Sequence, residues 1–192
     1  QTAQIVSTPI LRDFPDQFES ERLTIRAPRP GDGAENCAAI QESLAELRPW
    51  MPFAVEPLTP ETQEAVMRRA HADFMARTDL MLLLLLKGTD TLVGSSGLHR
   101  IDWRVPRFEI GYWLRTRYTG QGYMTEAVNA IAAFAFDTLG AHRVEIRCEE
   151  GNSRSAAVAR RCGFPLEGVL RNRTRNHLSG ELVNEMVFAQ IR

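Results

Sequence analysis

The residue pattern best suited to chemistry lies at positions 115–128, RTRYTGQGYMTEAV. Gly120 and Gly122 follow Arg117 closely, and apolar residues at helical spacing continue from there. Because glycine has no Cβ atom, successive backbone N–H groups in such a loop can face one anion. The beginning of a helix adds unpaired amides and partial positive charge. The pattern predicts a pyrophosphate-binding loop, although a plain loop ending in a helix cap would carry the same glycines.

Two other phosphate-binding patterns do not match this loop. The Walker loop needs a Gly-Lys pair followed by Ser or Thr, and the only lysine, Lys87, precedes its glycine. The dinucleotide fingerprint needs a third glycine, and Thr125 stands at that position. It also needs its first glycine directly after a strand, whereas five residues separate Leu114 from Gly120. The pattern that remains is R-x-x-G-x-G.

Periodicity predicts the elements that must position the loop. Apolar residues alternate in the expected strand at 22–28, run continuously at 80–86, and recur every three to four residues in the expected helices. We expect strands at 22–28, 80–87, 92–100, 107–114 and 142–149 with a hairpin at 168–191, and helices at 32–47, 60–77, 122–139 and 152–163. Thr59 and Pro60 are typical of a helix start. Residues 1–20 are expected to form an N-terminal arm with one short strand, and residues 21–192 a single α/β domain with a mixed sheet.

Composition excludes several classes of protein. The 192 residues are 44% hydrophobic and 24% charged, which favours one domain with a sizeable core. The net charge of −1 and the absence of a basic stripe argue against a nucleic-acid partner. The three cysteines lack redox or zinc spacing and favour a reduced, cytoplasmic environment, and the scattered histidines predict no metal site. The longest apolar run, 80–87, is too short to span a membrane.

Two separated segments resemble one enzyme superfamily. EIGYWLRTRYTGQGYMTEA (109–127) followed by RVEIRCEEGNSRSAAVARRCGFPLEG (143–168) is similar to the GCN5-related N-acetyltransferases, or GNAT superfamily, and most to its RimJ/RimL type. The resemblance covers roughly residues 20–188. It implies a GNAT fold, with a central mixed, mostly antiparallel twisted sheet of about seven strands flanked by about four helices. It also implies acetyl-CoA as the acetyl donor.

The resemblance further implies which residues hold the donor. Family members bind the pyrophosphate with the amides of the R-x-x-G-x-G loop, and the pantetheine arm pairs like an extra strand with the strand end before it, here about residues 112–115. Asn152 matches a family position that contacts the cofactor arm. The cofactor-binding residues so implied are Trp113, Leu114, Arg115, Arg117, Tyr118, Thr119, Gly120, Gln121, Gly122, Tyr123, Met124, Thr125, Asn152 and Ser155.

Acetyl transfer to an amine needs a group that takes a proton and benefits from one that protonates the thiolate. Glu109 is an acid in an apolar strand, and alternation puts it on the same face as Gly111 and Trp113, so we expect it to be the base, acting directly or through water. The alternative is an ion pair with an arginine such as Arg107. An N–H in a bulged strand at 111–113 would bind the oxyanion.

The acid is less clearly marked. Many superfamily members carry a tyrosine where Ala159 stands, and RimL-type enzymes carry an acidic residue near the position of Thr174. Ser155 matches a RimL-type serine and is predicted to bond the CoA sulfur, with helix capping as its alternative role. Cys148 also matches a RimL-type position, but a buried strand cysteine more often packs than reacts.

The acceptor is expected on the side of the early helices. Trp50 and Phe53, on a proline-stiffened loop, and Trp103 are predicted to bind the substrate, with ordinary packing as the alternative. The leading functional prediction is acetylation of a primary amine, either a protein N-terminal α-amine or the amine of a small molecule or antibiotic. The alternative is a non-catalytic acetyl-CoA-binding sensor. The chain is expected to be a monomer or a homodimer.

Overall fold

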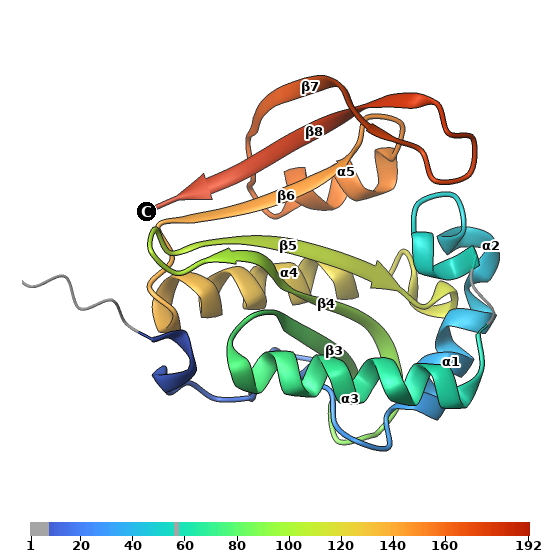
Figure 1. The fold of residues 1–192 in the computed structure, drawn as a ribbon, viewed down its shortest axis with the longest axis vertical. Coiled ribbons are helices and arrows are strands. Elements are labelled where there is room, and N and C mark those ends of the chain that lie inside the picture. The colour runs from blue at the N-terminus through green and yellow to red at the C-terminus, as the bar shows by residue number, and fades with distance from the viewer. Residues whose placement is uncertain (1–7, 56–57) are drawn as a thin grey trace, which may run out of the picture.

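The computed structural model describes residues 8–55 and 58–192, which form one mixed sheet covered by helices (Figure 1). The strands are β1 (Gln17–Glu19), β2 (Leu23–Arg26), β3 (Leu80–Leu86), β4 (Leu92–Asp102), β5 (Arg107–Leu114), β6 (Arg143–Glu149), β7 (Leu166–Arg175) and β8 (Leu182–Ile191). The α-helices are α1 (Gly33–Glu42), α2 (Leu44–Leu47), α3 (Pro60–Ala76), α4 (Tyr123–Ala133) and α5 (Ser153–Arg161).

The sheet has the order β1-β2-β3-β4-β5-β6-β8-β7, and every neighbouring pair is antiparallel except β5 and β6. The predicted mixed, mostly antiparallel sheet is therefore confirmed. It has eight strands instead of about seven, since the short strand expected within residues 1–20 pairs with β2. The division into an arm and a domain at residue 20 stays a prediction.

The helix expected at 32–47 is divided into α1 and α2 at Ser43. The Ser43 N–H donates to the Ile40 carbonyl and closes α1 with a non-helical backbone. Its side-chain oxygen accepts a hydrogen bond from the Thr116 N–H at 3.0 Å. A small polar residue at this break therefore ties α1 to the predicted phosphate loop, and five helices result instead of about four.

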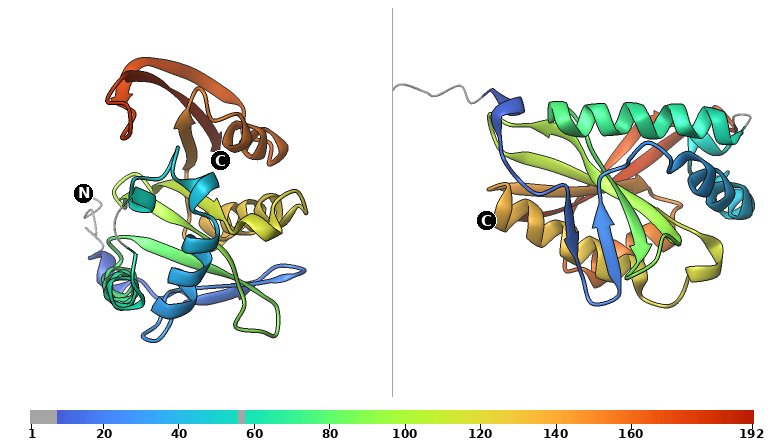
Figure 2. Two further views of the ribbon diagram at one scale, coloured as in Figure 1. Left: turned by 90° about the vertical axis from the view of Figure 1, so that its right-hand side faces the viewer. Right: turned by 90° about the horizontal axis from the view of Figure 1, so that it is seen from below.

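Helices cover both faces of the sheet. Figure 2 shows α3 and α4 on opposite sides of the strands. Leu82 and Leu84 of β3 pack in the cluster that includes α4, whereas Leu83 and Leu85 pack with Ala39 of α1 and with α3. A strand buried on both faces needs a continuous apolar run, which is what the leucine run in β3 supplies.

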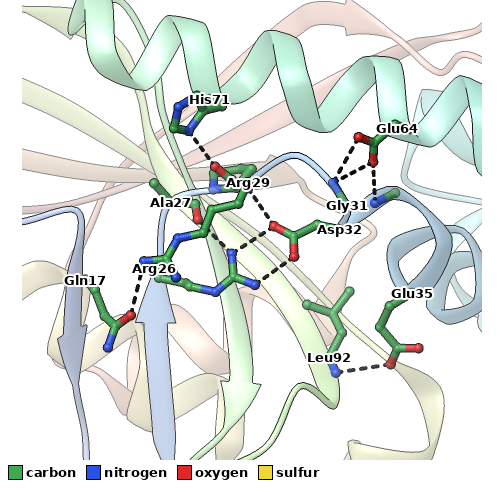
Figure 3. A network of polar contacts seen from close by, with 12 residues as sticks. Gln17, Arg26, Ala27, Arg29, Gly31, Asp32, Glu35, Glu64, His71 and Leu92 are labelled. Carbon is green, nitrogen blue, oxygen red and sulfur yellow. Dashed lines mark hydrogen bonds and ion pairs between the residues drawn. The ribbon is translucent and has the colours of Figure 1, made fainter.

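The start of α1 is fixed by a polar network between β2 and α3 (Figure 3). Asp32 accepts two hydrogen bonds from the guanidinium of Arg26 at 2.8 and 2.7 Å. Glu64 of α3 accepts hydrogen bonds from the N–H groups of Gly31 and Gly33. A Cβ atom on Gly33 would lie 2.3 Å from the backbone nitrogen of Glu64, so glycine permits this close helix contact. The network holds α1 in a defined position beside the sheet.

Strands β5 and β6 separate soon after they meet. They pair only through residues 107–109 of β5 and 143–145 of β6. Beyond this point β5 stays paired with β4 as far as Leu114, while β6 stays paired with β8 as far as Glu149. Figure 1 shows the two strands side by side at one end and apart at the other. The inner edges of the two strands thus leave an opening in the middle of the sheet.

The bulge expected at residues 111–113 is wrong. The pairing of β4 with β5 is regular from Gly94↔Leu114 to His99↔Glu109, and the register shifts only between His99 and Asp102. Arg100 lies in this shift with a φ of 47°. Gly111 instead leaves room for the ring of His99, since a Cβ atom at Gly111 would lie 3.3 Å from its Cδ2 atom.

Candidate active site

A cavity of about 410 Å³ lies at the opening between β5 and β6. Its walls come from β4, β5, β6 and β8, from the loop after α2 and from the start of α5. Its lining includes Glu109, Gly111, Trp113, Asn152 and Ser155. The separation of two strands therefore exposes a free strand edge beside a predicted base and a predicted acid.

The glycine loop has the predicted form. Gly120 and Gly122 have φ values of 75° and 82°, in the region that favours glycine. A Cβ atom at Gly120 would meet nothing within 4 Å. Gly122 is the N-cap of α4 and no side chain caps this helix start, so its first amides are available to an anion. These features fit the pyrophosphate of a CoA-type cofactor.

The two arginines of this loop contact α1. The Arg115 side chain is buried and donates to Glu35 at 2.7 Å and to Glu42 at 2.8 Å. Arg117 also pairs with Glu42. Hydrogen bonds from the two guanidiniums, of which that from Arg117 has the larger effect, lower the pKa of the Glu42 carboxyl to about 2. The structure does not bring the Arg115 side chain to the cavity. Anion binding by the backbone amides of the loop, more than by these two side chains, stays a prediction.

The other predicted loop residues divide between the surface and the core. Thr119 and Gln121 hydrogen-bond to backbone carbonyls within the loop, whereas the Met124 side chain lies in the core. Tyr118 and Tyr123 contact each other edge to face, with ring centroids 5.8 Å apart. Leu114 packs against the main core cluster, and the Thr125 hydroxyl accepts a hydrogen bond from Arg161 at 3.3 Å. A cofactor role for Leu114, Met124 and Thr125 would therefore rest on the backbone more than on side chains.

A tyrosine that the sequence reasoning missed joins β5 to α5. The Tyr112 hydroxyl donates to the Ser155 carbonyl at 2.8 Å and accepts from the Ser155 hydroxyl at 3.1 Å. Burial raises the pKa of Tyr112 well above its usual range, so the phenol keeps its proton. Asn152 caps α5 by accepting from the Ser155 N–H at 3.1 Å. Side chains alternate along a strand, so the sequence alone places Tyr112 on the face of β5 opposite Glu109. This position is the signal that could have identified Tyr112.

Cys148 lies beside Ser155 in the lining of the cavity. Burial raises the pKa of its thiol, which keeps the sulfur protonated and poorly nucleophilic. Cys148 is only partly buried, so the expectation of a packing role stays a prediction.

Glu109 is mostly buried in the cavity wall, with 17% of its side chain exposed. Its Oε2 atom lies 3.5 Å from Arg100 Nη1 and 3.6 Å from Arg147 Nε, so its neighbouring cations are these and not Arg107. Burial raises the pKa of Glu109 despite the two guanidiniums. A carboxyl with a raised pKa is a better proton acceptor near neutral pH than an ordinary one. Its role as the base stays a prediction.

Two of the three predicted substrate-binding aromatics line the cavity. Trp50 and Phe53 do, with Phe53 in a tilted contact with Trp113 at a centroid distance of 6.2 Å. The structure places Trp103 elsewhere: its Nε1–H donates to the Arg77 carbonyl, and its ring packs edge to face on Phe108. All three are aromatic residues that could bind a substrate, so residue type alone does not distinguish them. Only the tertiary fold shows that Trp103 packs in the protein while Trp50 and Phe53 line the cavity.

Comparison with protein families identifies the chain. The model of the acetyltransferase (GNAT) domain matches residues 22–165. The chain belongs to the GNAT acetyltransferase family. This match confirms the predicted superfamily, and together with the relatives described next it confirms the RimJ/RimL type and the assignment to acetyl-CoA-dependent N-acetyltransferases.

Several relatives of this GNAT acetyltransferase have descriptive names. It is 33% identical over 157 residues to the Bacillus subtilis protein named "Putative ribosomal N-acetyltransferase YdaF", covering 80% of this chain and 83% of that one. It is 37% identical over 82 residues to the ribosomal-protein-serine acetyltransferase of Escherichia coli, covering 43% of this chain and 46% of that one.

Solved structures share the fold. A ribosomal-protein-serine acetyltransferase of Vibrio cholerae, titled as putative, superposes with a TM-score of 0.76 at 27% identity over 96% of this chain and 99% of that one. The microcin C7 self-immunity acetyltransferase MccE, solved with acetyl-CoA and AMP, superposes with a TM-score of 0.86 at 23% identity over 93% and 98% of the two chains. The second likeness supports the fold alone.

Two further observations concern the described part of the chain. Within residues 8–55 and 58–192, no group of three or more His, Cys, Asp or Glu side chains is placed to hold a metal ion. No helix in these ranges is long and apolar enough to cross a membrane.

Proposed function

We propose that this GNAT acetyltransferase transfers the acetyl group of acetyl-CoA to the α-amine of a protein N-terminus by direct attack. The observation that carries the proposal is the cavity between β5 and β6, where a free strand edge, Glu109 and Ser155 face one space. The names of the relatives that act on ribosomal proteins support the acceptor class.

Backbone groups of this chain would bind acetyl-CoA, the acetyl donor. Amides of residues 120–125 would hold the pyrophosphate, and the unpaired edge of β5 at residues 110–114 would hold the pantetheine arm by strand-like hydrogen bonds. When bound, acetyl-CoA supplies an activated thioester carbonyl. The hydrogen bond from the Thr116 N–H to the Ser43 hydroxyl would hold the loop in position beside α1.

Other side chains of the cavity wall would accept a proton from the amine and orient it. The attacking nitrogen must lose a proton to become an amide, so a group in the cavity must accept that proton. Glu109 is proposed to do so, directly or through a water molecule. Arg100 and Arg147 would keep the carboxylate oriented, since both lie near its Oε2 atom. Trp50 and Phe53 would enclose the chain that follows the amine.

Ser155→Ala tests the predicted acid. The Ser155 hydroxyl is the donor in its bond with Tyr112, so it holds a proton at the cavity wall that could pass to a departing sulfur. We expect kcat to fall about 100-fold, the low end for loss of an acid–base group, with no change in the Kd of acetyl-CoA. Ser153→Ala, an exposed serine in the same helix turn, is the matched control. Full turnover by Ser155→Ala would leave the Ser155 hydroxyl with a structural role only, through its bond to Tyr112.

A second candidate function is acetylation of a small amine that carries a flat ring. The observation favouring it is the set of aromatic side chains in the cavity wall, Trp50, Phe53 and Trp113. MccE, which shares the fold, was solved with AMP beside acetyl-CoA. Rings stack on aromatic side chains with useful affinity, so these residues suit either a peptide or a ring-bearing amine.

The deciding experiment measures release of CoA thiol from acetyl-CoA against a panel of acceptors. The panel contains peptides that begin with Ser, Ala, Thr or Met, followed by amino acids, polyamines and amine antibiotics. Release with a Ser- or Ala-start peptide is the expected result. Release only with a small amine would replace the first candidate by the second. Micromolar binding of acetyl-CoA, about −8 kcal/mol, without release for any acceptor would favour a sensor.

A further inference from the structure

His99 of β4 lies in the wall of the cavity, and the roles given above do not use it. Its Nδ1 atom is 2.7 Å from Oδ2 of Asp79, the residue just before β3. A carboxylate can only accept a hydrogen bond, so Nδ1 carries a hydrogen in this pair. In the neutral ring the other nitrogen, Nε2, then has a free lone pair. Asp79 thus fixes both the tautomer and the orientation of the imidazole.

Two glycines make room for the ring of His99. Gly97 and Gly111 are paired across β4 and β5. A Cβ atom at Gly97 would lie 2.7 Å from both Cε1 and Nε2 of the imidazole, and one at Gly111 would lie 3.6 Å from Nε2. The ring therefore lies close to both glycines. Its free nitrogen is next to the segment of β5 that begins just past the last residue paired with β6.

Charged groups from every neighbouring strand face this position. Asp79 precedes β3, Arg100 follows His99 in β4, Glu109 is its register partner in β5, and Arg147 comes from β6. The His99 side chain is 30% exposed, so a proton taken up by Nε2 can pass to solvent. The Glu109 side chain is 17% exposed and carries two arginines at its Oε2. The two groups are adjacent but differ in access to water.

Acylation of an ammonium removes two protons from its nitrogen. A peptide α-amine has a pKa of about 8, so most of it is an ammonium at pH 7. One proton must leave before attack. The second leaves as the N–C bond forms, and the C–S bond then breaks with its electron pair on sulfur. One proton is taken up by that sulfur, and one is released to solvent. Glu109 serves one of these transfers in the proposed function.

We propose that His99, oriented by Asp79, takes the first proton, the one that turns the bound ammonium into a nucleophile. Nε2 accepts this proton and passes it to solvent, and Glu109 accepts the second proton during attack. The inference rests on the proposed function, because a first deprotonation is needed only for an acceptor that arrives as an ammonium. Asp79 acts through His99 and is a positioning residue.

The test compares two acceptors with His99→Gln. One is the Ser-start peptide, and the other is the same peptide blocked at its α-amine and ending in a hydrazide, whose nitrogen is already neutral at pH 7. We expect the variant to lose about 100-fold in kcat/KM with the α-amine, within the range for a general base, and less than about fivefold with the hydrazide. The loss with the α-amine should shrink as the pH rises past the pKa of that amine. Equal losses with both acceptors, or a loss independent of pH, would overturn the proposal.

Two further variants serve as a control and as a test of the positioning residue. His71→Gln is the matched control, because His71 bonds the Pro28 carbonyl and does not line the cavity. It should change neither acceptor's rate. Asp79→Asn should lose about tenfold with the α-amine and little with the hydrazide. The Kd of acetyl-CoA should be unchanged in all three variants, and a general loss of cofactor binding would indicate a structural role for His99.

A measurement without any acceptor separates failure of this inference from failure of the proposed function. NMR of the protein labelled with 15N in its histidine rings, with His99→Gln used for assignment, reports the protonation of each ring nitrogen. We expect Nδ1 of His99 to carry hydrogen, because it bonds Asp79. Hydrogen on Nε2 with none on Nδ1 would refute the inference even if peptides are acetylated. The expected tautomer with no peptide turnover would reject only the acceptor class.

Discussion

Glu109→Gln is expected to lower kcat/KM about 1,000-fold, within the range for loss of a general base. The amide keeps the size of the side chain but cannot accept the proton that the attacking nitrogen loses. Burial raises the pKa of Glu109, so the acid limb of the wild-type pH–rate profile should lie above the ordinary range of a glutamate. Activity falls as the pH drops through that value, because only the carboxylate accepts a proton. The profile of kcat/KM against pH for wild type and variant checks this prediction.

Stability measurements separate catalysis from folding in this variant. A carboxyl whose pKa is raised in the folded state holds its proton more tightly there than in the unfolded chain, so ionisation of Glu109 opposes folding as the pH rises. Removing the charge should therefore leave the melting temperature at pH 7 unchanged or higher. A variant that retains more than a tenth of wild-type activity would exclude Glu109 as the base. A variant that loses activity only because it unfolds would show a lower melting temperature.

Gly122→Val is expected to weaken acetyl-CoA binding about 100-fold, or about 2.7 kcal/mol. Gly122 has a φ of 82°, which a β-branched residue avoids, and it is the N-cap of α4. Relaxing the backbone would turn the amides of the loop away from a common centre, and the added methyl groups would stand where the pyrophosphate approaches. Calorimetric titration with acetyl-CoA measures the loss.

Gly88→Val provides the matched control for the glycine loop. Gly88 lies in the turn between β3 and β4 with a φ of 76°, and a Cβ atom there would meet nothing within 4 Å. The substitution imposes the same backbone strain, about 1–2 kcal/mol, at a position remote from the loop. It should lower stability without changing the Kd of acetyl-CoA. Equal weakening by both variants would show that strain, and not the loop, determines affinity.

Elements with local signals could be predicted from the sequence. The helix after Thr59 begins and ends as expected, because a capping box, Pro60 at its start and a left-handed residue at Arg77 define its ends within the segment itself. The glycine loop and the start of α4 could also be predicted from the sequence, because the glycines and the apolar residues at helical spacing are adjacent in the chain. The break at Ser43 was not accessible, because it depends on a hydrogen bond from Thr116 in a distant segment.

The site was predictable in part for the same reason. Glu109 and Ser155 were found through alternation and resemblance, and both line the cavity. The pairing of Asp79 with His99 needs the β3–β4 register, and the bond between Tyr112 and Ser155 needs α5 folded onto the sheet. Trp103 was misplaced because its residue type fits a binding site and a core equally well. Single-sequence patterns identify chemistry-bearing residues but not the partners that tertiary packing gives them.

The short junction between β5 and β6 has a consequence for the lifetime of the protein. Within the sheet, three residue pairs join the β1–β5 unit to the C-terminal unit of β6, β8, β7 and α5, and side-chain contacts such as Tyr112–Ser155 and Glu109–Arg147 complete the junction. So short a seam favours partial opening, in which the C-terminal unit separates while the rest stays folded. A ligand that bridges both strand edges binds only the closed form and suppresses opening by mass action. Proteases act on open forms, so the abundance of this enzyme is expected to rise and fall with the cell's supply of its acetyl donor.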